Sequence, residues 1–157
     1  MKPLSQREVN RLLNDWHRRL DLHAPVEAVL ELLAEEDFEM RTPQGILTTA
    51  GEFKRWYDEM TRRFFDETRA ITRLTITRAD DTAEVKMVVN WQARTWNPPA
   101  ARSKWLDFDA YETLIVRRSR SREQPVISTY IVEALRPLSD STNVWPTSAS
   151  PSKGPVL

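Results

Sequence analysis

Residues 104–117 read KWLDFDAYETLIVR, and this stretch decides the fold because two kinds of residue alternate along its whole length. One set of alternate positions is apolar at every place but one: Leu106, Phe108, Ala110, Glu112, Leu114 and Val116. The other set is largely polar, and such an alternation predicts a long strand with one face buried. The single carboxyl group in the apolar set, Glu112, is therefore expected to face the protein interior.

Further strands flank this one along the chain. Residues 85–94 alternate in the same way, residues 71–78 are rich in Thr and Ile, and residues 126–135 have two apolar faces. The connections are short and hold turn residues, such as Asp80-Asp81 and Asn97-Pro98-Pro99, which predicts antiparallel pairing. A short hairpin is expected around residues 38–48, with its turn at Thr42-Pro43-Gln44-Gly45.

Three helices are predicted in the N-terminal half. Ser5 and Glu8 form a capping-box pattern before a helix over about residues 6–20, and Thr49 and Glu52 repeat it before a helix that ends near residue 64. A second helix is expected to start at Pro25 and to carry an apolar face as far as Leu33. The order of elements defines the α+β class: a curved antiparallel sheet wrapped around three helices.

The chain divides into one domain, residues 1–136, and a C-terminal tail, residues 137–157. The tail holds four of the ten prolines and five serines without periodicity, so we expect it to be disordered. The start of the chain lacks an apolar signal core and no stretch is long enough to cross a membrane, so we expect a cytoplasmic protein without a membrane partner.

Composition excludes several classes of chemistry. The 157 residues contain no cysteine, two histidines and three glycines, which rules out thiolate metal sites, cysteine nucleophiles and a glycine-rich phosphate loop. The 23 basic and 23 acidic residues cancel, which argues against nucleic-acid binding by bulk charge. The arginine-rich run at residues 117–122 is expected to be a solvated turn. We expect no metal and no cofactor.

The element order, with the run LLAEEDF at residues 32–38 leading into the first strand, resembles the nuclear transport factor 2-like superfamily, also called SnoaL-like or ketosteroid-isomerase-like. The resemblance spans about residues 5–136 and implies a cone-shaped α+β barrel with an apolar pocket at its wide mouth. The superfamily includes isomerases, cyclases, hydrolases and dehydratases, as well as structural dioxygenase β subunits. By rough alignment, the catalytic Tyr and Asp of its isomerases fall on Trp16 and near Thr42, which cannot transfer protons at neutral pH. Steroid-isomerase chemistry is therefore not expected.

The third acidic position of those isomerases directs attention to Glu112, the candidate catalytic residue. Burial would raise the pKa of this carboxyl group and keep it neutral as a hydrogen-bond donor or acid. The alternatives are that a bulge turns Glu112 to solvent or that an arginine pairs with it. Glu133 could approach Glu112 if its own face of the last strand points inward, but a solvent-exposed Glu133 near the end of the strand is favoured. His17 is expected on a helix surface, and His23 is expected to cap a helix.

Five residues on faces predicted to point inward are the candidate ligand-binding set: Trp16, Phe38, Met40, Trp56 and Trp91. Simple core packing is the alternative for each of them. The leading hypothesis is a domain that binds a small apolar molecule, aromatic or polycyclic, and carries out cofactor-free acid–base chemistry through Glu112. The rival hypothesis is a non-catalytic structural or interaction subunit, like a dioxygenase β subunit. Because both faces of the last strand are apolar, a homodimer through the sheet is expected under either hypothesis.

Overall fold

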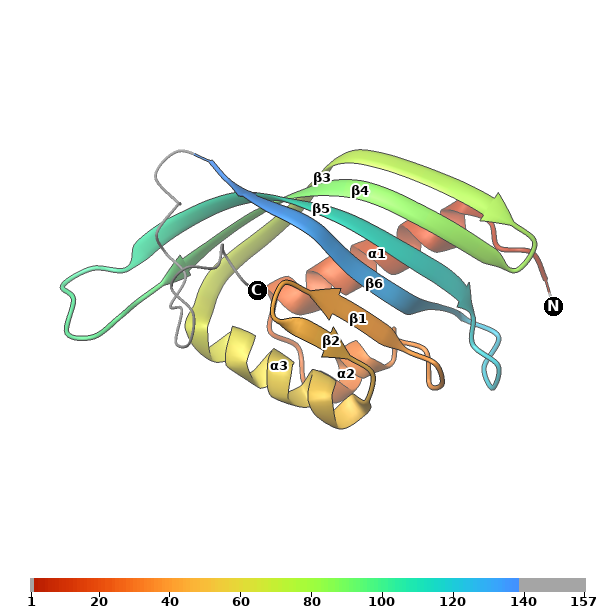
Figure 1. Ribbon diagram of the computed structural model, residues 1–157, viewed down its shortest axis with the longest axis horizontal. Helices are drawn as coiled ribbons and strands as arrows, with labels where there is room; N and C mark the ends of the chain where they lie inside the picture. Colours follow the sequence, from red (N-terminus) through yellow and green to blue (C-terminus); the bar gives the residue numbers. More distant parts are fainter. Residues whose placement is uncertain (1, 139–157) are drawn as a thin grey trace.

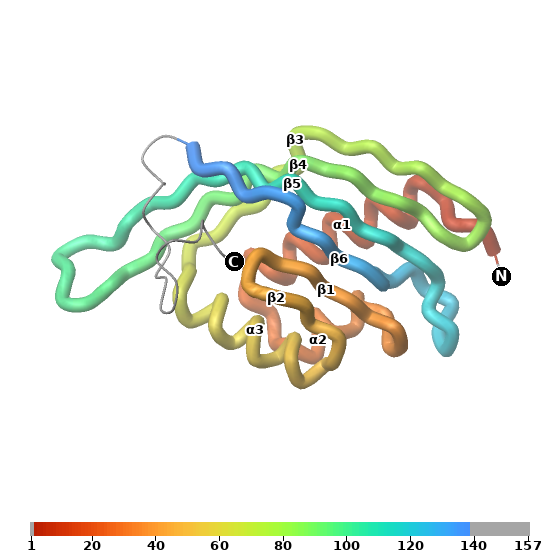
Figure 2. Tube along the Cα trace, viewed as in Figure 1, coloured from red at the N-terminus to blue at the C-terminus, as the bar shows by residue number. Residues whose placement is uncertain are grey.

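The computed structural model describes residues 2–138, so the predicted tail lies almost entirely outside the described residues. Three helices and six strands follow one another in the order α1 (Gln6–Asp21), α2 (Val26–Leu30), β1 (Glu39–Thr42), β2 (Gly45–Leu47), α3 (Ala50–Arg63), β3 (Phe64–Ala79), β4 (Thr82–Thr95), β5 (Lys104–Arg118) and β6 (Pro125–Pro137). The strands form one sheet in the order β2-β1-β6-β5-β4-β3, which curves over α1 without closing into a barrel (Figures 1 and 2). The predicted α+β class is confirmed.

The two capping boxes start helices where the sequence predicts them. In α1 the Ser5 hydroxyl accepts from the Glu8 backbone N–H, while the Glu8 carboxylate accepts from the Ser5 backbone N–H, both at 3.1 Å. Thr49 and Glu52 form the same pair of bonds at the start of α3. Each box satisfies backbone donors that a helix end leaves free, which fixes these boundaries.

Helix α2 is shorter than predicted: it ends at Leu30 and does not reach Leu33. The backbone of the next residues bonds to the last strand instead: Leu32 accepts from the Ile127 N–H, and Ala34 donates to the Ile127 carbonyl, both at 2.8 Å. Backbone groups that pair with a strand cannot also continue a helix, so the chain leaves α2 through a turn at residues 31–32 and reaches the bridge between Leu33 and Ile127.

The sheet differs from the prediction in two respects. Strand β1 pairs in parallel with β6, with Met40 opposite Tyr130, so the sheet is mixed and not purely antiparallel. Strand β3 begins at Phe64 and not near residue 71, because its first part pairs with the end of β4 around an irregularity between Phe65 and Thr68. That irregularity breaks the period-2 pattern on which a strand prediction depends.

Strand β5 has the predicted faces, and its alternate residues from Leu106 to Val116, including Glu112, are all buried. Strand β6 has two irregularities in its pairing with β5, and they change which of its residues point inward. As a result Tyr130 and Val132 are buried while Glu133 is exposed. The residue that meets Glu112 from β6 is therefore Tyr130, and not Glu133.

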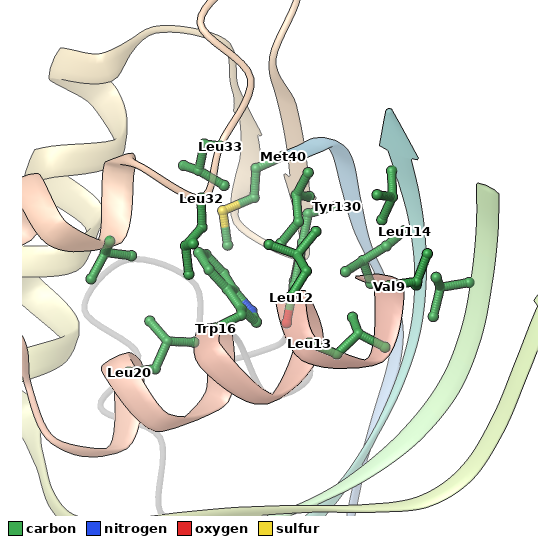
Figure 3. Close-up of a cluster of buried hydrophobic side chains, with 14 of the residues drawn as sticks. Val9, Leu12, Leu13, Trp16, Leu20, Leu32, Leu33, Met40, Leu114 and Tyr130 are labelled. Carbon is green, nitrogen blue, oxygen red and sulfur yellow. The ribbon is translucent and has the colours of Figure 1, made fainter. Parts of the chain in front are cut away.

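Aromatic side chains meet at the centre of the core between α1, α3 and the sheet (Figure 3). The ring of Trp16 lies 5.5 Å from that of Tyr130 and 6.3 Å from that of Phe53. A second cluster around Phe64, Trp91 and Phe108 fills the other end of the sheet. None of the helices in the described part of the chain is long and apolar enough to span a membrane.

The arginine-rich turn pairs with the acidic residues that follow α2. Arg120 contacts the Glu36 carboxylate at 2.7 Å, and Ser119 donates to Glu35 at 2.8 Å. Arg118 is buried and holds the N-terminal segment by donating to Glu8 and to the carbonyls of Lys2 and Pro3. The run thus has structural partners within the chain.

Candidate functional site

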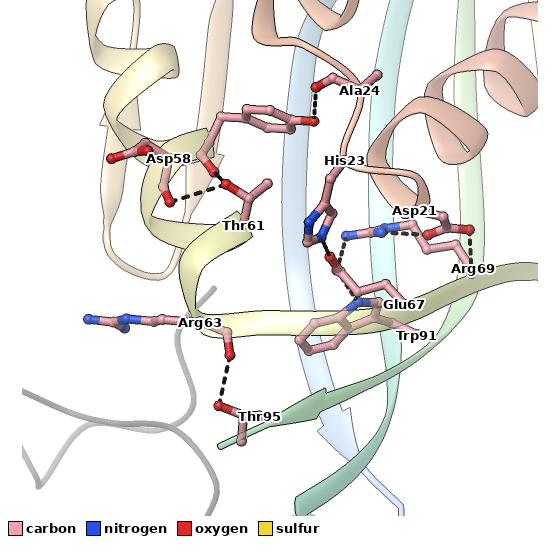
Figure 4. A network of polar contacts seen from close by, with 11 residues as sticks. Asp21, His23, Ala24, Asp58, Thr61, Arg63, Glu67, Arg69, Trp91 and Thr95 are labelled. Atoms are coloured by element: carbon pink, nitrogen blue, oxygen red, sulfur yellow. Dashed lines mark hydrogen bonds and ion pairs between the residues drawn. The ribbon is translucent and has the colours of Figure 1, made fainter. Parts of the chain in front are cut away.

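A network of polar side chains lies where α1 ends and β3 begins (Figure 4). Glu67 on β3 is its centre: Glu67 Oε2 lies 2.5 Å from His23 Nε2, and Glu67 Oε1 accepts from Trp91 Nε1 at 3.0 Å. Arg69 donates to Glu67 Oε1 at 3.2 Å and to Asp21 Oδ1 at 2.7 Å. Three segments far apart in sequence, around residues 21–23, 67–69 and 91, thus meet in one connected set of hydrogen bonds.

The backbone is unusual on both sides of the His23–Glu67 contact. His23 follows α1 with φ of 53°, and Asp66, which precedes Glu67, has φ of 50°. Both values lie in the left-handed region, which residues other than glycine seldom adopt. At Asp66 two residues of β3 stand opposite Ala93 of β4, which makes a bulge that turns Glu67 inward. Such outliers are concentrated at functional sites, which makes this contact a candidate site.

The guanidinium of Arg69 compensates the charge of the carboxyl groups on Glu67 and Asp21. Burial disfavours the charged form of Arg69, but Glu67 and Asp21 outweigh it and raise the pKa of this guanidinium. Burial raises the pKa of Asp21, and the attraction of Arg69 only partly offsets that effect. Buried charges of this kind are tolerated only when hydrogen-bonded partners surround them.

His23 has a ring nitrogen available for chemistry. Its side chain is 29% exposed, whereas that of Glu67 is 4% exposed. Nε2 faces the carboxylate, and none of the described residues hydrogen-bonds Nδ1. A carboxylate that accepts the N–H of one ring nitrogen leaves the other nitrogen with a free lone pair, so Nδ1 can accept a proton.

Glu112 lies deeper, in an apolar part of the interior. Its Oε2 accepts from the Tyr130 hydroxyl at 2.5 Å, and its Oε1 is buried without a hydrogen-bond partner among the described residues. Burial raises the pKa of Glu112 from 4.5 to about 7, against the opposing effects of the Tyr130 hydrogen bond and of Arg69. At neutral pH this carboxyl group therefore exists in both protonation states. Burial and the nearby Glu112 likewise raise the pKa of Tyr130.

The five predicted ligand-binding residues do not line a single space. Trp16 and Met40 are buried in the packed core of Figure 3. Phe38 belongs to the same buried cluster, and Trp91 is buried beside Glu67. Trp56 is half-buried and borders a pocket of about 460 Å³ between α3 and β2. Most of the other residues that line this pocket are charged or polar: Gln44, Glu52, Arg55, Glu59 and Arg63, beside Leu47 and Met60. Trp56 also packs against the cluster that contains Trp91, so one layer of side chains separates this pocket from the polar network.

The histidines correct the sequence analysis. His17 is buried and not on a helix surface, and burial together with Arg69 lowers its pKa to about 3, so it is neutral. His23 makes the contact with Glu67, a role that the sequence did not reveal. The partners are 44 positions apart, and no local spacing connects them. The one available signal was the charged run at residues 66–69, which is unusual for a strand that contacts the core.

The described residues contain no cluster of side chains suited to a metal ion.

The fold matches that of several solved structures. A protein of unknown function from Nostoc punctiforme with a cystatin-like fold is 16% identical, with a TM-score of 0.65 over 84% of this chain and 93% of that chain. A protein from Streptomyces avermitilis, assigned as a dehydratase of the NTF2-like family, is 15% identical, with a TM-score of 0.66 over 85% and 96%. Hexachlorocyclohexane dehydrochlorinase LinA-type3 from Novosphingobium barchaimii is 12% identical, with a TM-score of 0.69 over 86% and 90%.

These likenesses establish that the chain has the NTF2-like, or cystatin-like, fold, as the sequence resemblance implied. No protein-family model and no curated protein matches the sequence. At such low identities the likeness extends to the fold alone, so the chemistry has to be argued from the site itself.

Proposed function

We propose that this protein binds a small apolar molecule and catalyses an acid–base reaction on it without a cofactor, with His23 Nδ1 as the proton acceptor. The observation that carries the proposal is the short contact between His23 Nε2 and the buried Glu67, between two left-handed backbone positions. Glu67 fixes the orientation of the imidazole through its contact with Nε2. Arg69 and Trp91 hold Glu67 in place.

The reaction class that fits best is an elimination. His23 Nδ1 takes a proton from carbon, the C–H electron pair forms the new double bond, and the hydroxyl group on the neighbouring carbon leaves as water with the proton that the imidazolium returns. Among the proteins with this fold, one is assigned as a dehydratase and another is a dehydrochlorinase, and both names describe eliminations.

Glu112 has a second role in this proposal. Its unpartnered Oε1 and raised pKa suit a group that donates a hydrogen bond or a proton when neutral. Arg69 links Glu112 to the His23–Glu67 contact, because it donates to Glu67 directly and lowers the pKa of Glu112 electrostatically. Glu112 therefore assists the reaction, and the proton acceptor is His23.

The test is turnover of a bicyclic β-hydroxy ketone whose loss of water yields a fluorescent naphthol. His23→Asn is expected to lower kcat by about 100-fold or more, since a positioned base contributes roughly 10²–10⁴. Leu22→Ala is the matched control, because Leu22 precedes His23 and is 70% exposed. Equal activity of His23→Asn and the wild type would refute the assignment of the base.

One observation favours the rival function, a structural or interaction subunit. The aromatic rings of Trp16, Phe53 and Tyr130 meet in the middle of the molecule, so this part of the interior is filled. A thermal-shift screen with apolar cyclic compounds separates the two functions. Compounds that raise the Tm in a concentration-dependent way support ligand binding, because a ligand of the native state stabilises it by mass action. No shift across a broad set supports the structural role.

A further inference from the structure

Three large aromatic side chains are exposed at one end of the sheet, and we call them the aromatic tip. They are Phe65 on β3, Trp96 directly after β4 and Trp105 on β5, with exposed fractions of 39%, 52% and 46%. Phe65 stands opposite Arg94 of β4, and Arg94 stands opposite Trp105. Residues that stand opposite one another on adjacent strands share a face, so Phe65 and Trp105 flank Arg94 on one face of the sheet.

The aromatic tip points away from the core and lies at a projecting part of the molecule. The neighbouring residues on the three strands are buried, so the row between them faces outward: Phe64, Ala93 and Leu106. The hairpin between β4 and β5 extends beyond α3 at the left of Figures 1 and 2. The Trp96 indole N–H donates to the Ala100 carbonyl at 2.7 Å, which holds this ring against the loop of the hairpin.

The part of the chain that carries the two tryptophans is basic. Residues 94–105 contain no acidic residue and three basic ones: Arg94, Arg102 and Lys104. Arg102 and Lys104 are exposed. The acidic residues nearest to the tip in sequence are Asp66 and Asp107, and Asp107 accepts from the Asn90 amide at 2.7 Å. Basic residues thus exceed acidic ones around the exposed aromatic rings.

We propose that the aromatic tip docks on the surface of an anionic lipid bilayer. Indole rings favour the membrane interface because they combine an apolar body with a polar N–H group. Acidic headgroups attract the lysine and arginine side chains beside these rings. A projecting hairpin can place its end among the headgroups while the rest of the domain stays in water. Such a contact needs no membrane-spanning helix, so it goes beyond the expectation of no membrane partner, which considered spans and signal segments only.

Single-stranded nucleic acid, which also binds to aromatic and basic side chains, is a poorer fit to this surface. Such a strand needs a positively charged groove that follows its backbone, whereas these residues form a projecting end. The 23 basic and 23 acidic residues of the chain also argue against it. The membrane contact does not rest on the proposed catalysis, because His23 and Glu67 take no part in it.

Co-sedimentation of the full chain with lipid vesicles tests the proposal. The wild type is expected to bind vesicles of equal parts phosphatidylcholine and phosphatidylserine, and to bind pure phosphatidylcholine about tenfold more weakly or less. The double variant Trp96→Ala with Trp105→Ala is expected to lower the affinity for the mixed vesicles by about tenfold or more. Arg102→Glu with Lys104→Glu is expected to lower it by about 25-fold or more, because each cation near an anionic surface contributes about fivefold.

Tryptophan fluorescence gives a second readout. Binding is expected to shift the emission of the wild type to shorter wavelength, because Trp96 and Trp105 leave water. The double tryptophan variant is expected to show no such shift at the same concentration of vesicles.

Controls separate this contact from general effects of charge and folding. Ile46→Ala removes a 58% exposed apolar side chain from β2, at the other edge of the sheet. Lys54→Glu with Lys86→Glu reverses two exposed charges away from the tip. Both controls are expected to bind the mixed vesicles like the wild type, while circular dichroism checks that every variant is folded.

Several outcomes would overturn the inference. A wild type that binds neither kind of vesicle is one, and tip variants that bind as tightly as the wild type are another. Binding to single-stranded oligothymidylate without binding to vesicles would assign the tip to nucleic acid instead. Self-association that the double tryptophan variant abolishes, without binding to vesicles, would assign it to a second copy of the chain.

Discussion

Glu67 and Glu112 are both buried carboxyl groups on the inner face of the same sheet, and their surroundings differ in the number of donors. Glu67 meets three donor groups, from His23, Trp91 and Arg69. Glu112 meets the Tyr130 hydroxyl alone and keeps one oxygen without a partner among the described residues. Both residues are similarly withdrawn from water, since Glu67 as a whole is 9% exposed and Glu112 is 7% exposed.

The difference shows that burial alone does not set the state of a carboxyl group. Desolvation penalises the charged form, and only hydrogen bonds and opposite charges offset that penalty. Where the donors are few, as at Glu112, the pKa rises to about 7. At Glu67, by contrast, an arginine and two ring nitrogens converge on the carboxyl group and supply the hydrogen bonds that Glu112 lacks. This contrast is the basis for the proposed roles, proton donor for Glu112 and orienting group for Glu67.

Replacement of Arg69, the counter-charge of Asp21 and Glu67, is expected to have the largest effect on stability. Arg69→Met leaves Asp21 and Glu67 buried without their counter-charge, which is expected to cost about 3–5 kcal/mol of unfolding free energy at pH 7. Urea denaturation measures the loss. Arg62→Met is the control, because Arg62 is 73% exposed and its pair with Asp58 contributes little, under about 1 kcal/mol. Equal losses in both variants would contradict the account of the network.

The variant Glu112→Gln tests whether the titration of Glu112 contributes to the pH dependence of stability. Because the folded-state pKa of Glu112 is raised, its contribution is fully present below about pH 4.5 and is lost as the pH rises through about 7. The wild type is therefore expected to lose about 3 kcal/mol over this window on account of Glu112. Glu112→Gln should lack this part of the slope while retaining that of Asp21. Parallel curves of unfolding free energy against pH for the two proteins would show that Glu112 is not the titrating group.

The sequence predicts Glu112 well and Glu67 not at all, and the reason is local regularity. Strand β5 alternates without interruption through the stretch from Leu106 to Val116, so the inward position of Glu112 follows from counting residues. The start of β3 has a bulge at Asp66, and the charged residues around it resemble a solvent-facing segment. Periodicity predicts the faces of regular strands, and it carries no information about a residue that an irregularity turns inward.

His23 shows the same limit for long-range contacts. The sequence indicates the end of α1 and hence a loop at residues 22–25, but not that this loop faces β3. Its left-handed backbone conformation and its bond to Glu67 both depend on how the two elements pack. Helix starts, in contrast, were predictable because a capping box is complete within four residues, as Ser5 to Glu8 shows.

The smallest of the expected effects concerns a single donor to Glu67. Trp91→Phe keeps the ring in the cluster with Phe64 and Phe108 but removes the N–H that donates to Glu67 Oε1 at 3.0 Å. A lost hydrogen bond to a buried charged group is expected to cost about 1–3 kcal/mol, and the remaining donors to Glu67 favour the lower end. Trp105→Phe is the matched control, since Trp105 is 46% exposed and the same change there is expected to be close to neutral.

If Glu67 orients His23, Trp91→Phe should also lower kcat without a matching change in KM, because a loosened carboxylate holds the imidazole less well. A loss of stability with unchanged kcat would limit the Trp91–Glu67 bond to a structural role.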